Sequence, residues 1–243
     1  MNSLNIRTTS TIRKSKHFVL TVASVLAIVL AAARSNAQQL QQGISVEMPP
    51  ATNSAPMPEA DNEKAWIVTV TANGSLYFGI DPVTPESLLD EMKKRPRNRA
   101  AKLYIKADAR APFAHLEKVL EAARVDFFQS AVLLTSQPEA SNGGTLVPPR
   151  GLEVLIGSAA PAGAVATVVQ LHDSGLQSPI LKINNDQISW SALQTTLKQH
   201  FQKGDEKAIL VKADGQMPFA PVARAIDICR STGATVALAT PEL

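Results

Sequence analysis

The side chains best suited to chemistry in this chain lie in a stretch that occurs twice. The sequence YIKADARAPFAHLEKVLEAAR at 104–124 returns as LVKADGQMPFAPVARAIDICR at 210–230, with Lys-Ala-Asp and Pro-Phe-Ala in register. The carboxylates of Asp108 and Asp214 could act as general acids or bases, but no partner acid, base or nucleophile accompanies either one. A turn between a strand and a helix favours aspartate because its side chain accepts hydrogen bonds from backbone N–H groups. We therefore interpret both aspartates as turn residues and expect no enzyme.

Three other residues are candidates for contact with a partner. Lys106 and Lys212 occupy matched places at predicted strand ends, where surface charges are common, and as a pair they could mark a peptide or glycan contact. Trp66 and Trp190 are expected at the edges of two sheets, and an exposed Trp190 could serve a partner surface. The candidate partner-contact residues are Lys106, Lys212 and Trp190.

Nothing in the sequence predicts a metal or a cofactor. The four histidines are His17, His115, His172 and His200. No pair of them has helical spacing or the neighbouring Cys and Asp that a zinc site requires. The single cysteine, Cys229, cannot form an intrachain disulfide and matches Ala123 in the first copy, so we expect a small buried apolar side chain, with a reactive thiol as the alternative.

The positive charge of the chain is concentrated at its N-terminus. Residues 1–37 contain five basic residues and no acid, and subtracting them from the formal charge of +3 leaves −2 for the rest. Nucleic-acid affinity depends on Lys and Arg that neutralise phosphates, and this remainder has no surplus of them. We therefore expect no nucleic-acid partner.

An apolar segment follows the basic N-terminal stretch. FVLTVASVLAIVLAAA at 18–33 is 16 residues long, a little short for a typical spanning helix, and Ser35-Asn36-Ala37 has the small-x-small form of a signal-peptidase site. Two interpretations remain open. Residues 1–37 are a signal peptide cleaved after Ala37, or they are an uncleaved single-span anchor with the basic flank in the cytoplasm. Both export the rest of the chain.

The remaining sequence predicts one series of elements, repeated once. In the first copy we expect a strand at 44–48, a solvated Pro-rich connector at 49–65, a hairpin around Asn73-Gly74, and a helix capped by Thr84. A strand at 101–108, a helix at 112–124 and a strand at 130–135 complete it. In the second copy GLEVLIGSA corresponds to the first strand, and ATVVQL and PILKI correspond to the two strands of the hairpin. Ser189 corresponds to the helix cap Thr84. AILVKAD, PFAPVARAIDICR and ATVALAT then close it.

The quoted segments together resemble the ExbD/TolR family of biopolymer-transport proteins. The resemblance rests on the basic stretch, the apolar segment, QGISVEMPPA, the proline-rich connector, and the order of elements from VTVTANGSLYFG to AVLLT. It covers nearly the whole first half, and the second half resembles a further copy of that family's periplasmic domain. The resemblance implies a single-span inner-membrane protein whose periplasmic domains pair as dimers. It also implies an ExbB/TolQ-like channel subunit and a TonB/TolA-like protein as partners.

The expected fold class is α+β. We expect two tandem small two-layer domains, each a short mixed sheet with two helices on one face, preceded by one N-terminal apolar helix. The expected boundaries are 1–37 for the signal peptide or anchor, 43–139 and 151–243 for the domains, and 140–150 for the linker. We expect the two copies to form an intramolecular pseudo-dimer, with a homodimer of chains as the alternative.

The chain departs from the family pattern in its apolar segment. The family's spanning helix carries an aspartate that accepts and releases a proton, whereas residues 18–33 contain no ionisable side chain. The first hypothesis is therefore an inner-membrane, single-pass ExbD/TolR-like component without its own proton-carrying aspartate and with its domains in the periplasm. The alternative is a soluble periplasmic module, released by cleavage after Ala37, that binds peptidoglycan or an extended peptide.

Overall fold

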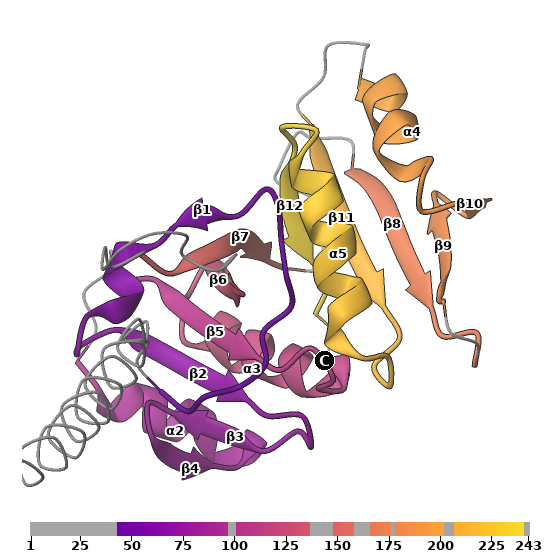
Figure 1. Cartoon of the computed structure of the whole chain (residues 1–243). Helices are drawn as coiled ribbons and strands as arrows, with labels where there is room; N and C mark the ends of the chain where they lie inside the picture. The colour runs from indigo at the N-terminus through magenta and orange to yellow at the C-terminus, as the bar shows by residue number, and fades with distance from the viewer. Residues whose placement is uncertain are drawn as a thin grey trace, which may run out of the picture. The chain divides into compact units, whose positions relative to one another are not determined.

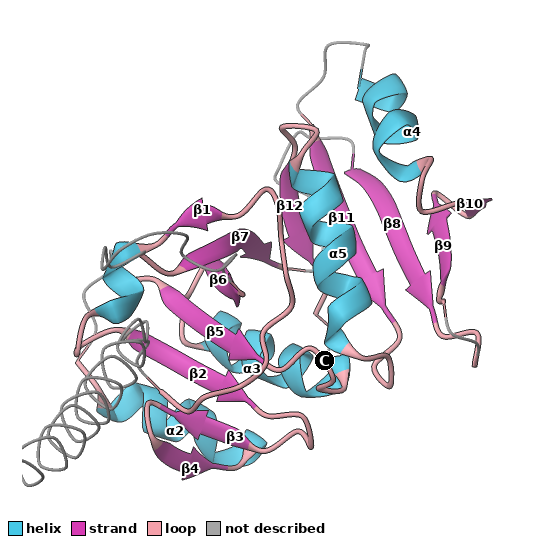
Figure 2. Cartoon of the chain, in the orientation of Figure 1, coloured by secondary structure: helices cyan, strands magenta, loops and turns pink. Residues whose placement is uncertain are grey.

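The computed structural model describes residues 43–96, 101–136, 148–157, 166–175, 178–201 and 207–240. All of them belong to one compact α+β unit with a large mixed sheet (Figures 1 and 2). We refer to residues 43–136 as the N-terminal half and to residues 148–240 as the C-terminal half. The expected apolar helix at 18–33 lies outside the described residues. Among the residues that the structure does describe, no helix combines the length and the apolar character needed to span a bilayer.

From Trp66 onward, the N-terminal half contains the predicted elements and one further strand, β4. Its elements are β2 (Trp66–Val70), β3 (Leu76–Phe78), β4 (Asp81–Val83), α2 (Pro85–Lys94), β5 (Leu103–Ala107), α3 (Phe113–Val125) and β6 (Ser130–Thr135). The hairpin predicted at Asn73-Gly74 is confirmed, because β2 and β3 pair antiparallel across it. The short strand β4 was not predicted; its Asp-Pro-Val sequence lacks the alternation and length that mark a strand.

The C-terminal half repeats this order after one additional strand, β7. Its elements are β7 (Arg150–Ile156), β8 (Ala166–His172), β9 (Ile180–Ile183), β10 (Asp186–Ile188), α4 (Leu193–His200), β11 (Ala208–Ala213), α5 (Phe219–Arg230) and β12 (Thr235–Leu238). Strands β8 to β12 correspond one by one to β2 to β6. Each half therefore combines an antiparallel edge of three strands with parallel inner strands.

The described strands form one sheet in the order β10-β9-β8-β11-β12-β7-β6-β5-β2-β3-β4. Strand β7 joins the two halves, because it pairs parallel with β12 of its own half and antiparallel with β6 of the other half. Gly151 lies at this junction, where an added Cβ would collide with the Val132 side chain and lie 3.0 Å from the Leu133 carbonyl oxygen. The absence of a side chain there permits the close pairing of β6 with β7.

The helices of each half cover a single face of its strands, as Figure 1 shows. On β5 the side chains of Leu103 and Ile105 point to this face, and on α3 the side chains of Phe113, Leu116 and Leu120 meet them. The period of two along the strand and of about 3.6 along the helix produces this match. All five side chains are buried, so this layer is the main core.

Helix α2 begins as its sequence predicts. The Thr84 hydroxyl accepts a hydrogen bond from the Ser87 N–H, and the Ser87 hydroxyl accepts one from the Thr84 N–H. Ser189 was predicted to cap the equivalent helix, and this prediction is wrong in position, because α4 begins at Leu193. The Ser189 hydroxyl accepts the Ala192 N–H at 3.3 Å, so it closes a turn that precedes the helix.

The prediction of a strand at 44–48 is also wrong. Residues 44–48 form no strand, and only Pro50 makes an isolated parallel bridge, to Ser136. The physical reason is competition for the edge of β6, which β7 occupies along six residue pairs. The sequence of 44–48 alternates suitably for a strand, but the tertiary structure gives its place to another segment.

The solvated connector predicted at 49–65 is a third correction. This segment contains β1 (Ala55–Pro56), which pairs with β7, and the 3₁₀ helix η1 (Pro58–Asp61). Met57 and Ala60 are buried against the sheet face opposite the helices, in a second cluster with Ile67, Tyr104 and Val132. The connector is ordered because it keeps these apolar strand residues away from water.

Candidate functional site

The two copies of the repeated stretch contact each other. The Phe113 N–H donates to the Met217 carbonyl at 2.8 Å, and the Phe219 N–H donates to the Ala111 carbonyl at 2.9 Å. A second pair of bonds, each 2.8 Å long, runs from Ala114 N–H to the Gly215 carbonyl and from Ala220 N–H to the Ala109 carbonyl. Pro112 and Pro218 face each other in an antiparallel bridge between the two pairs.

These four bonds are related by a local two-fold symmetry. Each donor in one half has its equivalent in the other half, and so has each acceptor. The donors are the first N–H groups of α3 and α5, which have no acceptor within their own helices. The N-cap residues Pro112 and Pro218 provide no side-chain cap, so carbonyls of the other copy accept these N–H groups instead. The repeated stretch therefore forms an isologous contact inside one chain, like the contact between two subunits of a dimer.

Asp108 holds the first turn together. Its carboxylate accepts hydrogen bonds from the Glu47 N–H at 3.1 Å and the Arg110 N–H at 3.0 Å. It also accepts two from the Arg110 guanidinium, at 2.9 and 3.1 Å. Chiefly because of the Arg110 side chain, the pKa of Asp108 falls from 3.8 to about 2. These bonds support the interpretation of Asp108 as a turn residue that also ties segment 43–50 to the sheet.

Asp214 has fewer partners at the matched position. It accepts the Asp173 N–H at 2.9 Å and lies 3.3 Å from the Nδ1 atom of His172. Gln216 stands where the first copy has Arg110, so the bidentate guanidinium is absent from this turn. The two aspartates therefore occupy equivalent turns but differ in how strongly they are bound.

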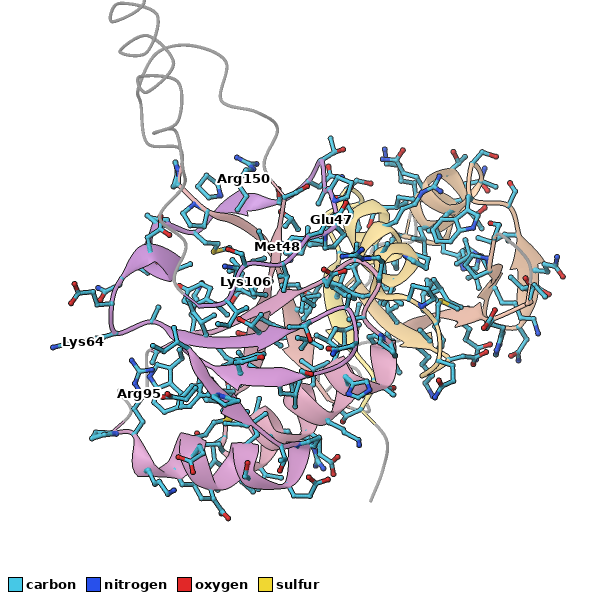
Figure 3. All side chains as sticks on the ribbon, turned by 60° about the horizontal axis from the view of Figure 1, so that its bottom comes forward. Glu47, Met48, Lys64, Arg95, Lys106 and Arg150 are labelled. Atoms are coloured by element: carbon cyan, nitrogen blue, oxygen red, sulfur yellow. The ribbon has the colours of Figure 1, made fainter. Side chains whose placement is uncertain are left out.

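Lys106 differs from the sequence expectation. It was predicted as a surface charge, but it is 3% exposed beneath the connector. Burial lowers the pKa of Lys106, while the nearby carboxylate of Asp61 acts in the opposite direction. Burial likewise raises the pKa of Asp61, with Lys106 opposing it. Figure 3 shows Lys106 within the body of this half, whereas Lys64 extends from its surface.

Lys212 and Trp190 occupy different surroundings from Lys106. Lys212 is exposed on β11, on the opposite side of the strand from the core residue Val211. Trp190 is half-buried and packs against the main core. The Arg224 guanidinium lies over the Trp190 ring, 4.6 Å from the ring centroid. The three candidate partner-contact residues therefore do not form one surface. Trp66 was expected at a sheet edge, but β2 is an inner strand and Trp66 is buried.

A groove lies beside the connector, next to the beginning of β2 and β5. Its volume is about 390 Å³. It is lined by Glu59, Asn62, Lys64, Ala65, Trp66, Ala101, Lys102 and Tyr104. The Tyr104 hydroxyl donates to Glu59 at 3.4 Å, and burial, followed by the negative charge of Glu59, raises the pKa of Tyr104 to about 12. Tyr104 is therefore a neutral hydrogen-bonding group at neutral pH.

The groove is suited to binding rather than to acid–base chemistry. Its lining contains two lysines and one glutamate but no histidine or cysteine. Lys102 lies 3.4 Å from Glu153, and both of these side chains are partly exposed. Charges of both signs beside the apolar side chains of Ala65, Trp66 and Ala101 match a ligand that has both ammonium and carboxylate groups. Sequence reasoning missed this groove, because the connector residues that build it were expected in solvent.

Cys229 and the described histidines offer no metal site. Cys229 is fully buried on α5, and burial raises the pKa of its thiol to about 12, as expected for a small core residue. Within the described ranges no group of three or more His, Cys, Asp or Glu side chains could hold a metal ion. His17 lies outside those ranges.

Comparison with known proteins agrees with the duplicated architecture. A family model described as "Biopolymer transport protein ExbD/TolR" matches the chain twice, over residues 19–137 and 125–242. No curated protein and no solved structure matches the chain. Each match of the family model contains one complete set of strands and helices, including one copy of the Lys-Ala-Asp to Pro-Phe turn. The chain therefore belongs to the ExbD/TolR family of biopolymer transport proteins.

Proposed function

We propose that this protein is a non-enzymatic component of a cell-envelope biopolymer-transport or energy-transduction complex. In this proposal, residues 18–33 form a single-pass anchor in the inner membrane. Residues 43–139 and 151–243 are two ExbD/TolR-like domains in the periplasm, joined by a linker at 140–150. Support comes from the family membership of both halves and from the charge distribution, in which the basic residues precede the apolar segment.

The reciprocal pairing of the repeated turns carries the proposal. Four backbone hydrogen bonds related by a two-fold axis are the kind of contact that two separate subunits make in a homodimer. Joining the subunits in one chain raises the effective concentration of the second copy to the millimolar range for a short linker. We propose that the chain acts as an intramolecular pseudo-dimer, so that one molecule replaces a pair.

The proposed partners are an ExbB/TolQ-like channel subunit and a TonB/TolA-like protein. Residues 18–33 contain no ionisable side chain, so a partner subunit must supply any proton-carrying carboxylate. This chain would then transmit motion through its periplasmic domains without binding the proton itself.

Capture of cross-linked partners from membranes tests the proposal. We expect the tagged full chain to capture a multispan channel subunit, and loss of that subunit to abolish the function of this chain. Recovery of the chain alone after cross-linking would contradict the transport role. A carbonate wash of membranes separates an anchored chain, which stays in the pellet, from a chain cleaved after Ala37, whose mass shows the loss.

A pair of proline substitutions tests the pseudo-dimer. Ala114→Pro removes an N–H that donates to the Gly215 carbonyl, at a place in the first helical turn where proline is otherwise tolerated. His115→Pro is the matched control, because the second copy already has Pro221 at that position. We expect a monomeric wild-type chain. We expect Ala114→Pro, and not His115→Pro, to loosen the contact between the repeated turns, which a broader distance distribution between spin labels on α3 and α5 would show, while the β6–β7 pairing keeps the halves joined. A wild-type homodimer would favour the alternative assembly.

One observation favours a second candidate function, a module that binds peptidoglycan or an extended peptide. Of the two ends of the sheet, β4 contains Pro82, which has no N–H to donate, whereas β10 has no proline. Strand β10 could accept an added peptide strand, and the charged groove could bind a zwitterionic peptide stem. Gln187→Pro should abolish peptide binding by β10, and Lys102→Ala should weaken binding of muropeptides in the groove. If the chain binds neither ligand, this candidate is excluded.

A further inference from the structure

Three large apolar side chains are exposed in the described part of the chain, and all three lie at one end of the N-terminal half. They are Ile80, Val125 and Phe127, with exposed fractions of 71%, 38% and 84%. The aromatic residues Trp66, Phe78 and Phe128 link them. The Trp66 ring centroid lies 5.5 Å from that of Phe78 and 5.7 Å from that of Phe128. Phe78 is two residues before Ile80, and Phe128 directly follows Phe127.

Phe127 is exposed in a backbone conformation that disfavours it. Its φ of 63° lies in the left-handed region, which costs a residue with a Cβ roughly 1 kcal/mol. The equivalent residue after α5 is Gly233, with a φ of 76°. The same backbone turn therefore has the favoured residue in one half and an exposed phenylalanine in the other.

The other two exposed residues differ between the halves in the same direction. Ile80, in the turn before β4, corresponds to Asn185 before β10, and Val125 corresponds to Ser231. The C-terminal half thus has Asn, Ser and Gly where the N-terminal half has Ile, Val and Phe. An apolar group of this kind on only one half indicates a contact that only this half makes.

Basic residues adjoin this apolar group. The sequence KKRPRNRAAK at 93–102 has six basic residues and no acid, and we assign to the surface only Lys93, Lys94, Arg95 and Lys102, which the structure describes. The Arg95 guanidinium lies 5.2 Å from the Trp66 ring centroid and 5.7 Å from that of Phe78, which places this stretch beside the aromatic residues. Figure 3 shows Arg95 and Lys64 on the same side of this half. Asp81 and Asp126 adjoin Ile80 and Phe127, and Lys94 and Lys102 lie 2.6 and 3.4 Å from Glu91 and Glu153. The described cations of this end outside those ion pairs are Lys64, Lys93 and Arg95.

The polypeptide enters the described structure near the same end. A Cβ on Gly43 would lie 3.2 Å from the Ile67 side chain and 3.4 Å from the Gly79 carbonyl oxygen, one residue from Ile80. Residues 34–42 separate Gly43 from the apolar segment at 18–33. Nine residues span at most about 30 Å. If residues 18–33 are anchored, this end of the half stays within reach of the bilayer.

We propose that this end of the N-terminal half docks on the surface of the anchoring membrane, with Phe127 and Ile80 among the acyl chains and the basic residues near anionic lipid headgroups. The proposal rests on the anchor in the proposed function. Aromatic and aliphatic side chains beside Lys and Arg are the combination that binds bilayer interfaces. The described part of the C-terminal half has no exposed large apolar side chain and remains free to contact proteins.

The test uses the full chain in vesicles, with matched labels in the two halves. The background variant is Cys229→Ala, because the first copy has Ala123 at the matched position and the chain then contains no other cysteine. A fluorophore is attached at Asp81→Cys or at its counterpart Asp186→Cys. Brominated lipids should quench the label at position 81 several-fold more than the label at 186 when the vesicles contain phosphatidylglycerol. Ile80→Asn with Phe127→Gly, which copies the C-terminal half, should equalise the two signals.

Charge variants test the headgroup contact separately. Each basic residue near an anionic surface changes the partition coefficient between membrane and water by about fivefold. Lys93→Gln should therefore lower the ratio of docked to undocked label at position 81 by about that factor. Lys198→Gln, the matched change in α4, should have no effect. Equal quenching at 81 and 186 in vesicles that retain the chain after a carbonate wash would overturn docking. Shielding of position 81 only in native membranes would also overturn it, in favour of a protein contact.

The anchor and the docking surface can fail independently. If the carbonate wash releases the chain, the anchor is disproved, and the released chain is floated with phosphatidylglycerol vesicles. Flotation that depends on Phe127 would support docking without an anchor. No flotation would reject it.

Discussion

Five strands and two helices recur in the same order in the two halves, β2 to β6 with α2 and α3, and β8 to β12 with α4 and α5. The halves differ in what covers the sheet face opposite the helices. In the N-terminal half the connector covers that face, buries Met57 and Ala60, and encloses Lys106. In the C-terminal half the corresponding connection between β7 and β8 is much shorter, and Lys212 on β11 is exposed. The environment of a repeated residue therefore depends on the length of a neighbouring connection, even where the strand that holds it is unchanged.

A second difference concerns strand β7. It pairs with β12 as the first strand of its own half, and it also pairs with the edge of β6, the place equivalent to its own beside β12 that a strand at 44–48 would take by analogy. Two copies of one sequence pattern compete for one site, and only one can form the pairs. Duplication inside one chain thus gives two matched segments different structures, whereas two separate, identical chains can keep both segments alike.

The largest expected effect tests whether the halves are energetically coupled. Phe113→Ala and Phe219→Ala each empty a fully buried site at the reciprocal contact and should lower the free energy of unfolding by about 3–5 kcal/mol. Because the two turns hold each other, the double variant should deviate from additivity by more than about 0.5 kcal/mol. Urea unfolding of the purified chain measures this. Strict additivity would show that Phe113 and Phe219 are not coupled through the reciprocal contact.

The next effect concerns the matched lysines. Lys106→Ala should lower the free energy of unfolding by about 2–4 kcal/mol, because it leaves a cavity and removes the cation beside Asp61. Lys212→Ala should change it by less than about 0.5 kcal/mol, because Lys212 is exposed. Lys106→Met keeps the volume and should cost less than Lys106→Ala. Equal costs for Lys106→Ala and Lys212→Ala in urea titrations would mean that the connector does not cover Lys106 in solution.

Asp108 and Asp214 should contribute differently to the pH dependence of the free energy of unfolding. The folded-state pKa of Asp108 is about 2, below its ordinary value of 3.8, so its ionised form stabilises the fold above pH 3.8. Asp108→Asn should lower the free energy of unfolding by about 1–2 kcal/mol at pH 7. This difference should shrink as the pH falls from about 3.8 to about 2, and it should be nearly absent below that. Asp214→Asn is the matched control, and a cost as large as that of Asp108→Asn would remove the assigned role of Arg110.

The smallest effect compares Phe127 with Gly233. Phe127→Gly should raise the free energy of unfolding by up to about 1 kcal/mol, because glycine adopts the left-handed region without a Cβ penalty. Gly233→Ala should lower it by about 1 kcal/mol for the same reason. Thermal unfolding monitored by circular dichroism can resolve both changes. A loss of stability in Phe127→Gly would show that Phe127 has a packing role, against the docking inference.

Most elements of the fold could be predicted from the sequence because they depend on local signals. Thr84 and Pro85 mark a helix start, Asn73-Gly74 marks a hairpin, and the apolar spacing of α3 and α5 marks their buried faces. Strands β4 and β10 were not predicted, because three residues are too few to show the alternation of apolar and polar side chains that marks a strand. The ordered connector escaped because its Pro-rich composition is that of a linker, and its burial depends on apolar strand residues far along the chain.

The candidate sites were less predictable than the elements. Lys106 and Lys212 were chosen because they are matched in the repeats, and Trp190 because an exposed tryptophan suits a partner surface, but neither the repeat nor the residue type determines exposure. The groove and the exposed Phe127 combine residues from distant segments, so no local pattern announces them. Alignment of the two copies could have identified Phe127, since it stands opposite Gly233.

By itself, the sequence determined that this chain contains one folding pattern twice, that its basic residues precede an apolar segment, and that this segment has no proton-carrying group. These are properties of residue order and type. Only the tertiary structure decided which strand occupies the edge of β6, which of two matched lysines is buried, and that the repeated turns bind each other. Each of these outcomes depends on segments distant in sequence that compete for the same surface, and the free energy of that competition is not encoded in any single stretch.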